Sequence, residues 1–415
     1  MELKKYKLGD VADIVNGATP STHNSENYDG SIIWITPKDL SGQKQKIIRR
    51  GQRNISEIGF NNCSAQMIPP YNILMSSRAP IGLLAINENE CCTNQGFKNL
   101  VLDKSICDTD YMYYYLQFHM KEIEALGSGT TFKEISKSAL QGIEIRLPDL
   151  EKQRDIAKCL SDLDHKIELN KQINDNLEAM AKQLYDYWFV QFDFPNEEGK
   201  PYKSSGGAMV WNEKLKREIP QGLDTPKIGD IEKNIITGKT PSCADEDNFG
   251  GDIPFVTIDD IRGNLFVFEA QRTLSTKGAD SQEKKYLPIG SLSVSCIGTI
   301  GIMGFVARLA QTNQQINSIV FEHEYNKEFL YFSLKLYFEN AKAKTGNVFA
   351  NMSKEEFASI IVAYPPKQIL QAFHNKVAPI FDSIKNNIEE INSLTKQRDE
   401  LLPPLMNGQA TVNSD

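Results

Sequence analysis

The chain has 415 residues, 40% hydrophobic and 24% charged, which is enough for two or more domains that each bury a core. The net charge of −8 argues mildly against a DNA-binding protein, although binding depends on local basic clusters rather than on the total. A polar N-terminus and the lack of an apolar run of about 18 residues predict neither a secretion signal nor a membrane span, so we expect a cytoplasmic protein. The seven cysteines and five histidines lack the spacing of disulfide frameworks or zinc sites, so we expect free thiols and no metal.

Residues 1–150 are expected to form a first domain that consists mostly of β-structure. Short apolar or alternating runs, bounded by Gly, Pro and Asn, predict strands at Ile32–Ile35, Ile73–Ser76, Leu83–Ile86 and Ile143–Leu147. An aromatic-rich run predicts a helix over Asp110–Ala125. The fold class indicated is α+β, with a curved or partly closed sheet.

Residues 151–190 carry the pattern of a long helix. Its apolar residues recur at steps of four and three, at Ile156, Leu160, Leu163, Ile167, Leu177 and Leu184. Asn170 and Asn174 occupy positions in the same seam. Sustained spacing of this kind is typical of a coiled coil, in which a seam asparagine fixes the register at a cost in stability.

Residues 191–222 predict a linker between two domains. An aromatic cluster would anchor its start, formed by Tyr187, Trp188, Phe189, Phe192 and Phe194. Pro195–Tyr202 and Ser204–Gly207 then supply the Pro, Gly, Asn and Ser residues that are typical of connectors. A domain boundary is therefore expected here.

Residues 223–366 repeat the first domain in the same order, so a second copy of its fold is expected. Leu287–Leu309 predicts buried strands, and Glu328–Lys342 predicts an aromatic-rich helix. The matched segments include Leu8–Asp10 with Ile228–Asp230, Asn16–Ser21 with Thr237–Ser242, Tyr28–Leu40 with Phe249–Ile261, Thr93–Gln95 with Thr312–Gln314, and Pro148 with Pro365. Their offset drifts by only a few residues, which indicates an internal duplication.

Residues 367–405 predict a second long helix, followed by a flexible tail at 406–415. The seam residues are Phe373, Val377, Ile380, Ile384, Ile391, Leu394 and Leu401, with Asn387 at the place of Asn170. Equal placement in both repeats suggests that the helices pair with each other; the alternative is that each packs on its own domain. About 30 residues would give a rigid spacer of roughly 45 Å. Leu402-Pro403-Pro404 predicts a sharp end to the helix.

Two short segments look catalytic, and both fail on inspection. Thr237–Thr240 has the end of a phosphate-binding loop, but Lys233 stands where the pattern needs a glycine. Ile68–Tyr71 is similar to the Asp/Asn-Pro-Pro-Tyr/Phe motif of adenine methyltransferases, but isoleucine cannot accept the hydrogen bond from the target amine. No glycine-rich strand-to-helix turn suits a bound cofactor. We expect no active site and no cofactor.

Motifs along nearly the whole chain resemble the specificity subunits of type I restriction-modification systems. The segments that carry the resemblance are Thr19–Ser21, Trp34–Leu40, Ser76–Gly82, Thr93–Phe97, Phe132–Ser136, Leu147–Gln153, Trp188–Asp193 and Tyr202–Gly207. The second repeat departs from them in having Ile297–Thr299 where the first has Arg78–Pro80. That difference could be structural or could change the bases that are read.

The resemblance implies two tandem target-recognition domains joined by two long antiparallel coiled-coil helices, with pseudo-twofold symmetry. Such a subunit binds double-stranded DNA and two methyltransferase subunits, and the trimer methylates adenines in a bipartite sequence. Translocase-nuclease subunits complete the restriction enzyme. The subunit itself is non-catalytic. A tandem repeat with a rigid spacer also suits two half-sites about a helical turn apart.

Base reading needs side chains that reach the edges of a groove, above all arginine and lysine. The candidates in the first domain are Lys38, Arg49, Arg50, Arg53, Arg78 and Lys98. Those in the second domain are Lys239, Arg262, Arg272, Lys277, Lys284 and Lys285. Residues that the repeats share, such as Thr36/Thr257 and Asn94/Asn313, are expected to form scaffold hydrogen bonds, because the two domains should read different bases.

Three other functions compete with a specificity subunit. A stand-alone sequence-specific regulator would use the coiled coil to dimerise and would bind DNA tightly without partners. A fused methyltransferase would need the cofactor and target-amine motifs that the sequence lacks. A pure scaffold of a defence complex would need no basic groove, and the acidic net charge leaves room for it.

Overall fold

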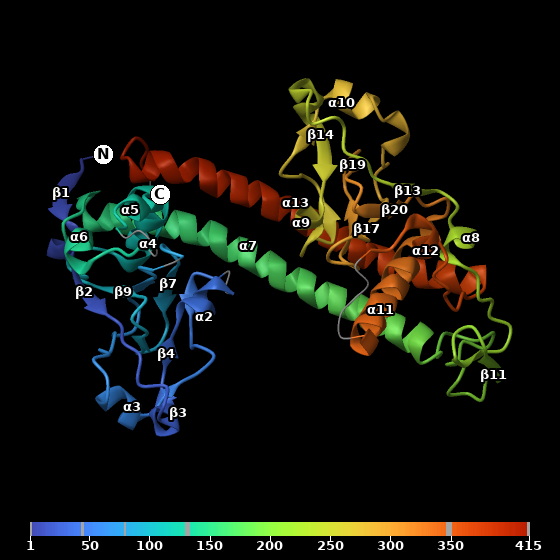
Figure 1. Ribbon diagram of the computed structural model, residues 1–415, viewed down its shortest axis with the longest axis horizontal. Coiled ribbons are helices and arrows are strands. Elements are labelled where there is room, and N and C mark those ends of the chain that lie inside the picture. The colour runs from blue at the N-terminus through green and yellow to red at the C-terminus, as the bar shows by residue number, and fades with distance from the viewer. Residues whose placement is uncertain (1, 43–44, 79, 129–132, 346–350, 413–415) are drawn as a thin grey trace. The chain divides into compact units, whose positions relative to one another are not determined.

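The computed structural model describes residues 2–42, 45–78, 80–128, 133–345 and 351–412 (Figure 1). Ala79 and Phe132 of the motifs above, and residues 413–415 of the expected tail, lie outside the described residues. The chain divides into two compact units. The first consists of Met1–Leu169 and Asn392–Asp415, and the second of Asn170–Ile391.

The first unit is built around a five-stranded sheet of order β2-β9-β6-β7-β5. These strands are Ala12–Asn16, Lys98–Leu102, Ile73–Met75, Leu84–Asn87 and Ile47–Ile48. β1 (Lys4–Lys7) pairs with β10 (Glu144–Leu147), β4 (Trp34–Ile35) pairs with β8 (Cys92–Thr93), and β3 is Tyr28–Ile32. The helices are α1 (Leu8–Val11), α2 (Pro37–Ser41), α3 (Glu57–Asn61), α4 (Thr109–Phe118), α5 (Met120–Ala125) and α6 (Lys137–Gln141), with η1 at Ser25–Asn27.

The second unit repeats this sheet in the order β13-β20-β17-β18-β15. These strands are Ile235–Thr237, Ile316–Ile319, Leu292–Ser295, Met303–Val306 and Phe266–Val267. A second sheet contains β16 (Thr273–Leu274), β14 (Phe249–Val256) and β19 (Gln311–Thr312). The helices are α8 (Ile228–Ile231), α9 (Ile258–Ile261), α10 (Thr276–Asp280), α11 (Lys327–Thr345) and α12 (Lys354–Ala358), with η3 (Glu246–Asn248), η4 (Glu283–Lys285) and η5 (Glu324–Asn326).

The duplication predicted from the sequence is confirmed by hydrogen bonds that recur at matched positions of the two units. Asp39 accepts hydrogen bonds from the backbone and hydroxyl of Thr36, at 2.8 and 2.7 Å. Asp260 accepts the same two from Thr257 at the same distances. Asn94 and Asn313 likewise each accept a backbone N–H two residues further on. The residues shared by the repeats therefore form scaffold hydrogen bonds, as predicted.

Two long helices contribute to both units: α7 (Leu150–Tyr185, green) and α13 (Lys367–Met406, red in Figure 1). Within the second unit, the amide of Asn387 donates to Asn174 at 2.8 Å, and that of Asn170 donates to Glu390 at 2.9 Å. Residue numbers rise along one helix as they fall along the other, so the pair is antiparallel. The prediction that the two helices pair with each other is confirmed by these contacts.

The predicted sharp end at Pro403-Pro404 is wrong, because α13 continues to Met406. The prolines remove only two N–H donors from the last turns, and their carbonyls still accept hydrogen bonds from Asn407 and Gln409. The following residues are not a free tail over their described part. Met406 is 2% exposed in the core of the first unit, and Ala410 and Val412 pack against that core.

The linker between the repeats is more structured than its composition indicates. α7 ends in a single π-helical turn, Asp186–Val190. Trp188 and Phe189 are buried there beside Phe373, with ring centroids 5.8 and 5.0 Å from its ring, so the aromatic residues anchor the start of the linker as predicted. The chain then forms an antiparallel hairpin of β11 (Met209–Asn212) and β12 (Arg217–Pro220), which the sequence analysis did not anticipate.

Candidate nucleic-acid interface

Three of the predicted DNA-binding residues come together in one groove of the first unit. Lys38, Arg50 and Arg53 line a depression of about 690 Å³, together with Asp29 and the backbone of Gly51. Lys38 is an exposed residue of α2. Arg50 is an exposed residue of the loop that follows β5. Within the described part of the chain, neither has an ion-pair partner. The groove is therefore a concave surface with two unpaired cations.

Arg53 is the most constrained side chain of this groove. Its guanidinium donates to both carboxylate oxygens of Asp29, at 3.0 and 3.1 Å, and lies 4.0 Å from the centre of the Tyr28 ring. The hydrogen bond from Arg53 lowers the pKa of Asp29, so the carboxylate stays ionised. Asp29 has a φ of 61°, a left-handed conformation that is uncommon outside glycine. The pair fixes a planar cation against an aromatic face.

In the second unit, Arg272 lies over an aromatic ring as Arg53 does in the first. Gln52 and Gln271 donate their backbone N–H groups to the equivalent aspartates at 2.8 Å, which places Arg53 and Arg272 at matching positions. The guanidinium of Arg272 lies 4.5 Å from the centre of the Phe249 ring. Gly250, with a φ of 84°, occupies the place of Asp29. Among the described residues, Arg272 consequently has no carboxylate partner.

The remaining candidates of the first unit form ion pairs. Arg78 and Lys98 both contact Glu134, at 2.8 and 3.2 Å. Burial acts to raise the pKa of Glu134, but the hydrogen bonds from these two cations lower it overall. The side chain of Lys98 is only 9% exposed, so it is placed as a buried support rather than as a surface contact. Arg49 is exposed and pairs with Glu88 at 2.7 Å, outside the residues that line the groove.

The other candidates of the second unit differ in how much they are engaged. Lys277 contacts Asp245 and Asp247, at 2.8 and 3.3 Å, and Lys285 donates to the carbonyl of Thr237 at 2.8 Å. Arg262 lies 3.9 Å from Asp259. Lys239 and Lys284 are exposed. Of the six candidates in this unit, Lys239, Arg272, Lys284 and Lys285 have no ion-pair partner within the ranges that the structure describes.

The segments that look catalytic are structural. The backbone N–H groups of Gly238 and Lys239 donate to Ile316 and Thr312, at 3.0 and 2.9 Å, so they cannot cradle a phosphate. Any Cβ on Gly238 would lie 2.1 Å from the carbonyl oxygen of Asn313, which explains the glycine. In the other segment, Ile68 is fully buried and pairs with Cys91 in an isolated antiparallel bridge.

The sequence alone did not reveal that Arg53 and Arg272 each lie over an aromatic ring. Tyr28 and Phe249 were matched as repeat positions, but each lies more than twenty residues before its arginine. The signal available was the change from Asp29 to Gly250 between otherwise matched segments. That change acquires meaning only when the fold brings the arginine above the ring.

Three cysteines of the first unit are buried thiols. Burial raises the pKa of Cys91, Cys92 and Cys107 to about 12, which keeps these thiols protonated and unreactive. Within the described ranges, no group of three or more His, Cys, Asp or Glu side chains is arranged to hold a metal ion. Over the same ranges, no helix has the length and apolar character of a membrane span.

Comparison with known proteins identifies the family. Residues 1–179 and 220–398 match the family described as type I restriction modification DNA specificity domain. The chain belongs to this family. It is 32% identical to the type I restriction enzyme MjaIX specificity subunit of Methanocaldococcus jannaschii, over 98% of this chain and 93% of that protein. It is 31% identical to the HindI specificity subunit of Haemophilus influenzae, over 98% and 99%.

A solved structure supports the fold of this specificity-family chain. The S subunit of a type I restriction-modification system from M. genitalium superposes with a TM-score of 0.61, at 16% sequence identity, and the match covers 98% of this chain and 96% of that one. The likeness concerns the fold alone. The fold class predicted from the sequence, two repeated recognition domains with two long helices, is confirmed.

Proposed function

We propose that this chain is the DNA sequence-specificity subunit of a type I restriction-modification complex. Each unit reads one half of a bipartite, asymmetric site. Partner methyltransferase subunits, two for each chain, then methylate adenines, and translocase-nuclease subunits cleave unmodified DNA in the cytoplasm. The chain itself is non-catalytic. Membership of the specificity family and the named relatives support this function.

The observation that carries the proposal is the pair of equivalent arginines. Arg53 and Arg272 sit on aromatic faces at the same place in two copies of one fold, yet only Arg53 is neutralised by a carboxylate. A guanidinium held by an aromatic ring is suited to bidentate contact with a guanine edge. Two frameworks with the same hydrogen bonds but different surfaces are what reading an asymmetric site requires.

A genome-wide methyladenine map tests the proposal. Cells would express this chain with its neighbouring methyltransferase subunit, and the map is expected to contain one split motif that is absent without this chain. Arg272→Ala should relax or abolish one half of the motif, because a good bidentate base contact contributes about 1–3 kcal/mol of discrimination. Arg53→Ala should change the other half more weakly, because the guanidinium of Arg53 already pairs with Asp29.

The control is Lys200→Ala, which removes an exposed lysine paired with Glu198 in the linker and should leave the motif unchanged. Methylation without any split motif, or a motif that neither arginine variant alters, would contradict the assignment of these residues. Tight sequence-specific binding by the purified chain, with no effect on methylation, would favour the stand-alone regulator instead.

A further inference from the structure

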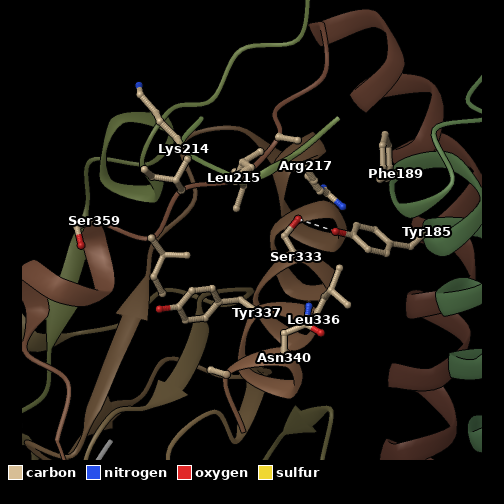
Figure 2. A pocket seen from close by; sticks show the side chains of 15 residues that line it. Tyr185, Phe189, Lys214, Leu215, Arg217, Ser333, Leu336, Tyr337, Asn340 and Ser359 are labelled. Atoms are coloured by element: carbon tan, nitrogen blue, oxygen red, sulfur yellow. Dashed lines mark hydrogen bonds between the residues drawn. The ribbon is translucent and has the colours of Figure 1, made fainter. Parts of the chain in front are cut away.

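A pocket of about 580 Å³ lies in the second unit, apart from the candidate DNA-binding residues. The β11–β12 hairpin, helix α11 and the segment after α12 form its walls (Figure 2). Phe189, Leu336 and Ile360 supply apolar surface, and Arg217, Tyr185 and Ser333 supply polar groups. The volume lies within the range of about 300–1,000 Å³ that is typical of small-ligand sites.

Arg217 is the less exposed of the two cations that line this pocket. Its guanidinium lies 5.0 Å from the centre of the Phe192 ring, and burial lowers the pKa of the side chain. Figure 2 shows it directed toward the hydroxyl groups of Tyr185 and Ser333, which hydrogen-bond to each other at 3.0 Å. Among the residues that the structure describes, no carboxylate lines the pocket or pairs with Arg217. A partly desolvated cation without a counter-ion is costly and calls for an anion.

The first unit provides an internal comparison. Its equivalent cleft, of about 300 Å³, is lined by Tyr115, His119, Glu122 and Ile143–Ile145, which match the positions of Ser333, Tyr337, Asn340 and Ile360–Val362. This cleft contains Glu122 and Glu144 and no lysine or arginine. The cations of the second pocket, Lys214 and Arg217, both come from the linker hairpin. The hairpin therefore changes an acidic cleft of the repeat into a basic one.

We propose that the pocket of the second unit binds a carboxylate ligand with an apolar body. The planar guanidinium of Arg217 presents two parallel N–H donors that match one carboxylate group. The apolar body lies against Phe189, Leu336 and Ile360, and Lys214 at the exposed edge adds a second positive charge. This ligand chemistry is shared by free aryl or alkyl acids and by a glutamate next to an aromatic residue in a partner protein. The first unit, with its two glutamates, does not bind it.

Titration calorimetry on the full-length chain tests the proposal with 4-phenylbutyrate and its neutral amide as probes. The acid is expected to bind at one site, at least about tenfold more tightly than the amide, because charge-assisted hydrogen bonds are the strong ones. Arg217→Gln should remove that difference. Lys216→Gln, one residue earlier in the hairpin and paired with Glu213 at 2.8 Å, should leave it unchanged.

A second variant keeps the test open if Arg217→Gln fails to fold. Asn340 is exposed on α11 at the pocket, so Asn340→Trp should fold and block entry of the acid.

A second probe, N-acetyl-Phe-Glu-amide, distinguishes the two sources of the carboxylate ligand. Tighter binding than 4-phenylbutyrate assigns the site to an acidic segment of a partner protein, and weaker binding assigns it to a free acid. Equal binding of acid and amide, or binding of the acid that survives both variants, would overturn the proposal.

Discussion

Asp29 and Gly250 show how one residue can change the charge of a recognition surface without changing its scaffold. Both adopt left-handed backbone conformations, with φ values of 61° and 84°, and both follow the ring that supports an arginine. Only Asp29 neutralises its arginine. Because the conformation is the same, an exchange between the two residues alters the electrostatics more than the backbone.

The reciprocal exchange gives a prediction for DNA affinity. Asp29→Gly removes a negative charge and frees the guanidinium of Arg53, so nonspecific affinity should rise severalfold at low salt and its dependence on salt should steepen. Gly250→Asp should weaken binding by a similar factor, because the new carboxylate can pair with Arg272. Fluorescence anisotropy at several salt concentrations measures both. Shifts of the same sign in the two variants would contradict the equivalence of the two positions.

His374 gives the second unit a pH-dependent contribution to stability. Its Nδ1 lies 2.7 Å from a carboxylate oxygen of the buried Glu328, and this hydrogen bond raises the pKa of His374 although burial opposes it. Glu324 acts in the same direction as Glu328, and Lys327 acts against both. A raised pKa in the folded state means that the stabilisation is complete below the unfolded value of about 6.5. It is lost as the pH rises through the folded value.

His374→Gln should therefore destabilise the protein most at acidic pH. Glutamine still donates a hydrogen bond to Glu328 but carries no charge. The difference in unfolding midpoint between the native chain and the variant is expected to be largest near pH 5.5 and to shrink by about pH 8.5. Chemical denaturation at both values checks this. A difference that is independent of pH would mean that His374 acts through packing alone.

At the level of elements, the antiparallel helices are registered by polar side chains rather than by apolar packing alone. Asn387 and Asn174 contact each other at 2.8 Å on partly buried faces of α13 and α7. Each single change to alanine leaves the other amide without this partner and should cost about 1 kcal/mol in the free energy of unfolding. The double variant should reveal a coupling of about 0.5–1.5 kcal/mol in a mutant cycle.

The neighbouring Asn386 provides the control for this cycle. Its side chain is exposed on α13, so Asn386→Ala should change the free energy of unfolding by less than about 0.5 kcal/mol. Additive effects of Asn174→Ala and Asn387→Ala would show that the amide contact makes no net contribution to pairing.

The elements also show what a sequence reveals and what it hides. The seam of α7 and α13, the strands at Ile73–Met75 and Leu84–Asn87, and the duplication all followed from periodicity and from matched segments. These features depend on neighbours close in sequence or on a second copy of the same segment. The β11–β12 hairpin escaped prediction, because its exposed Val210 and Trp211 sit among residues typical of connectors. The contacts of the candidate site residues were harder to predict. The tertiary fold alone brings an arginine such as Arg53 into contact with its aromatic ring and its carboxylate.

At the scale of the whole molecule, the first unit is discontinuous in sequence. Leu405 and Met406, at the end of α13, are 2% exposed in a core formed mainly by residues before position 161. Leu405→Ala should therefore destabilise the first unit by about 2–5 kcal/mol. Leu401, on the same helix, is 37% exposed, so Leu401→Ala should cost much less.

Hydrogen exchange locates the effect of these two variants. Leu405→Ala is expected to reduce amide protection in α4 of the first unit and to leave α11 of the second unit unchanged, because Leu405 belongs to the core that contains Tyr111 and Leu116. Loss of protection in α11 but not in α4 would contradict the division of the chain into these two units.

This discontinuity has a consequence for biosynthesis. The ribosome completes Met1–Leu169 long before it reaches Asn392, and the more than 200 residues between them form the other unit. At the usual pace of about 5–20 residues per second, the nascent first unit waits roughly 10–45 s for the helix that closes its core. The second unit, whose residues are continuous, can mature first. The part of the protein that is translated earliest is thus the last to become complete, and its apolar surface must be shielded in the meantime.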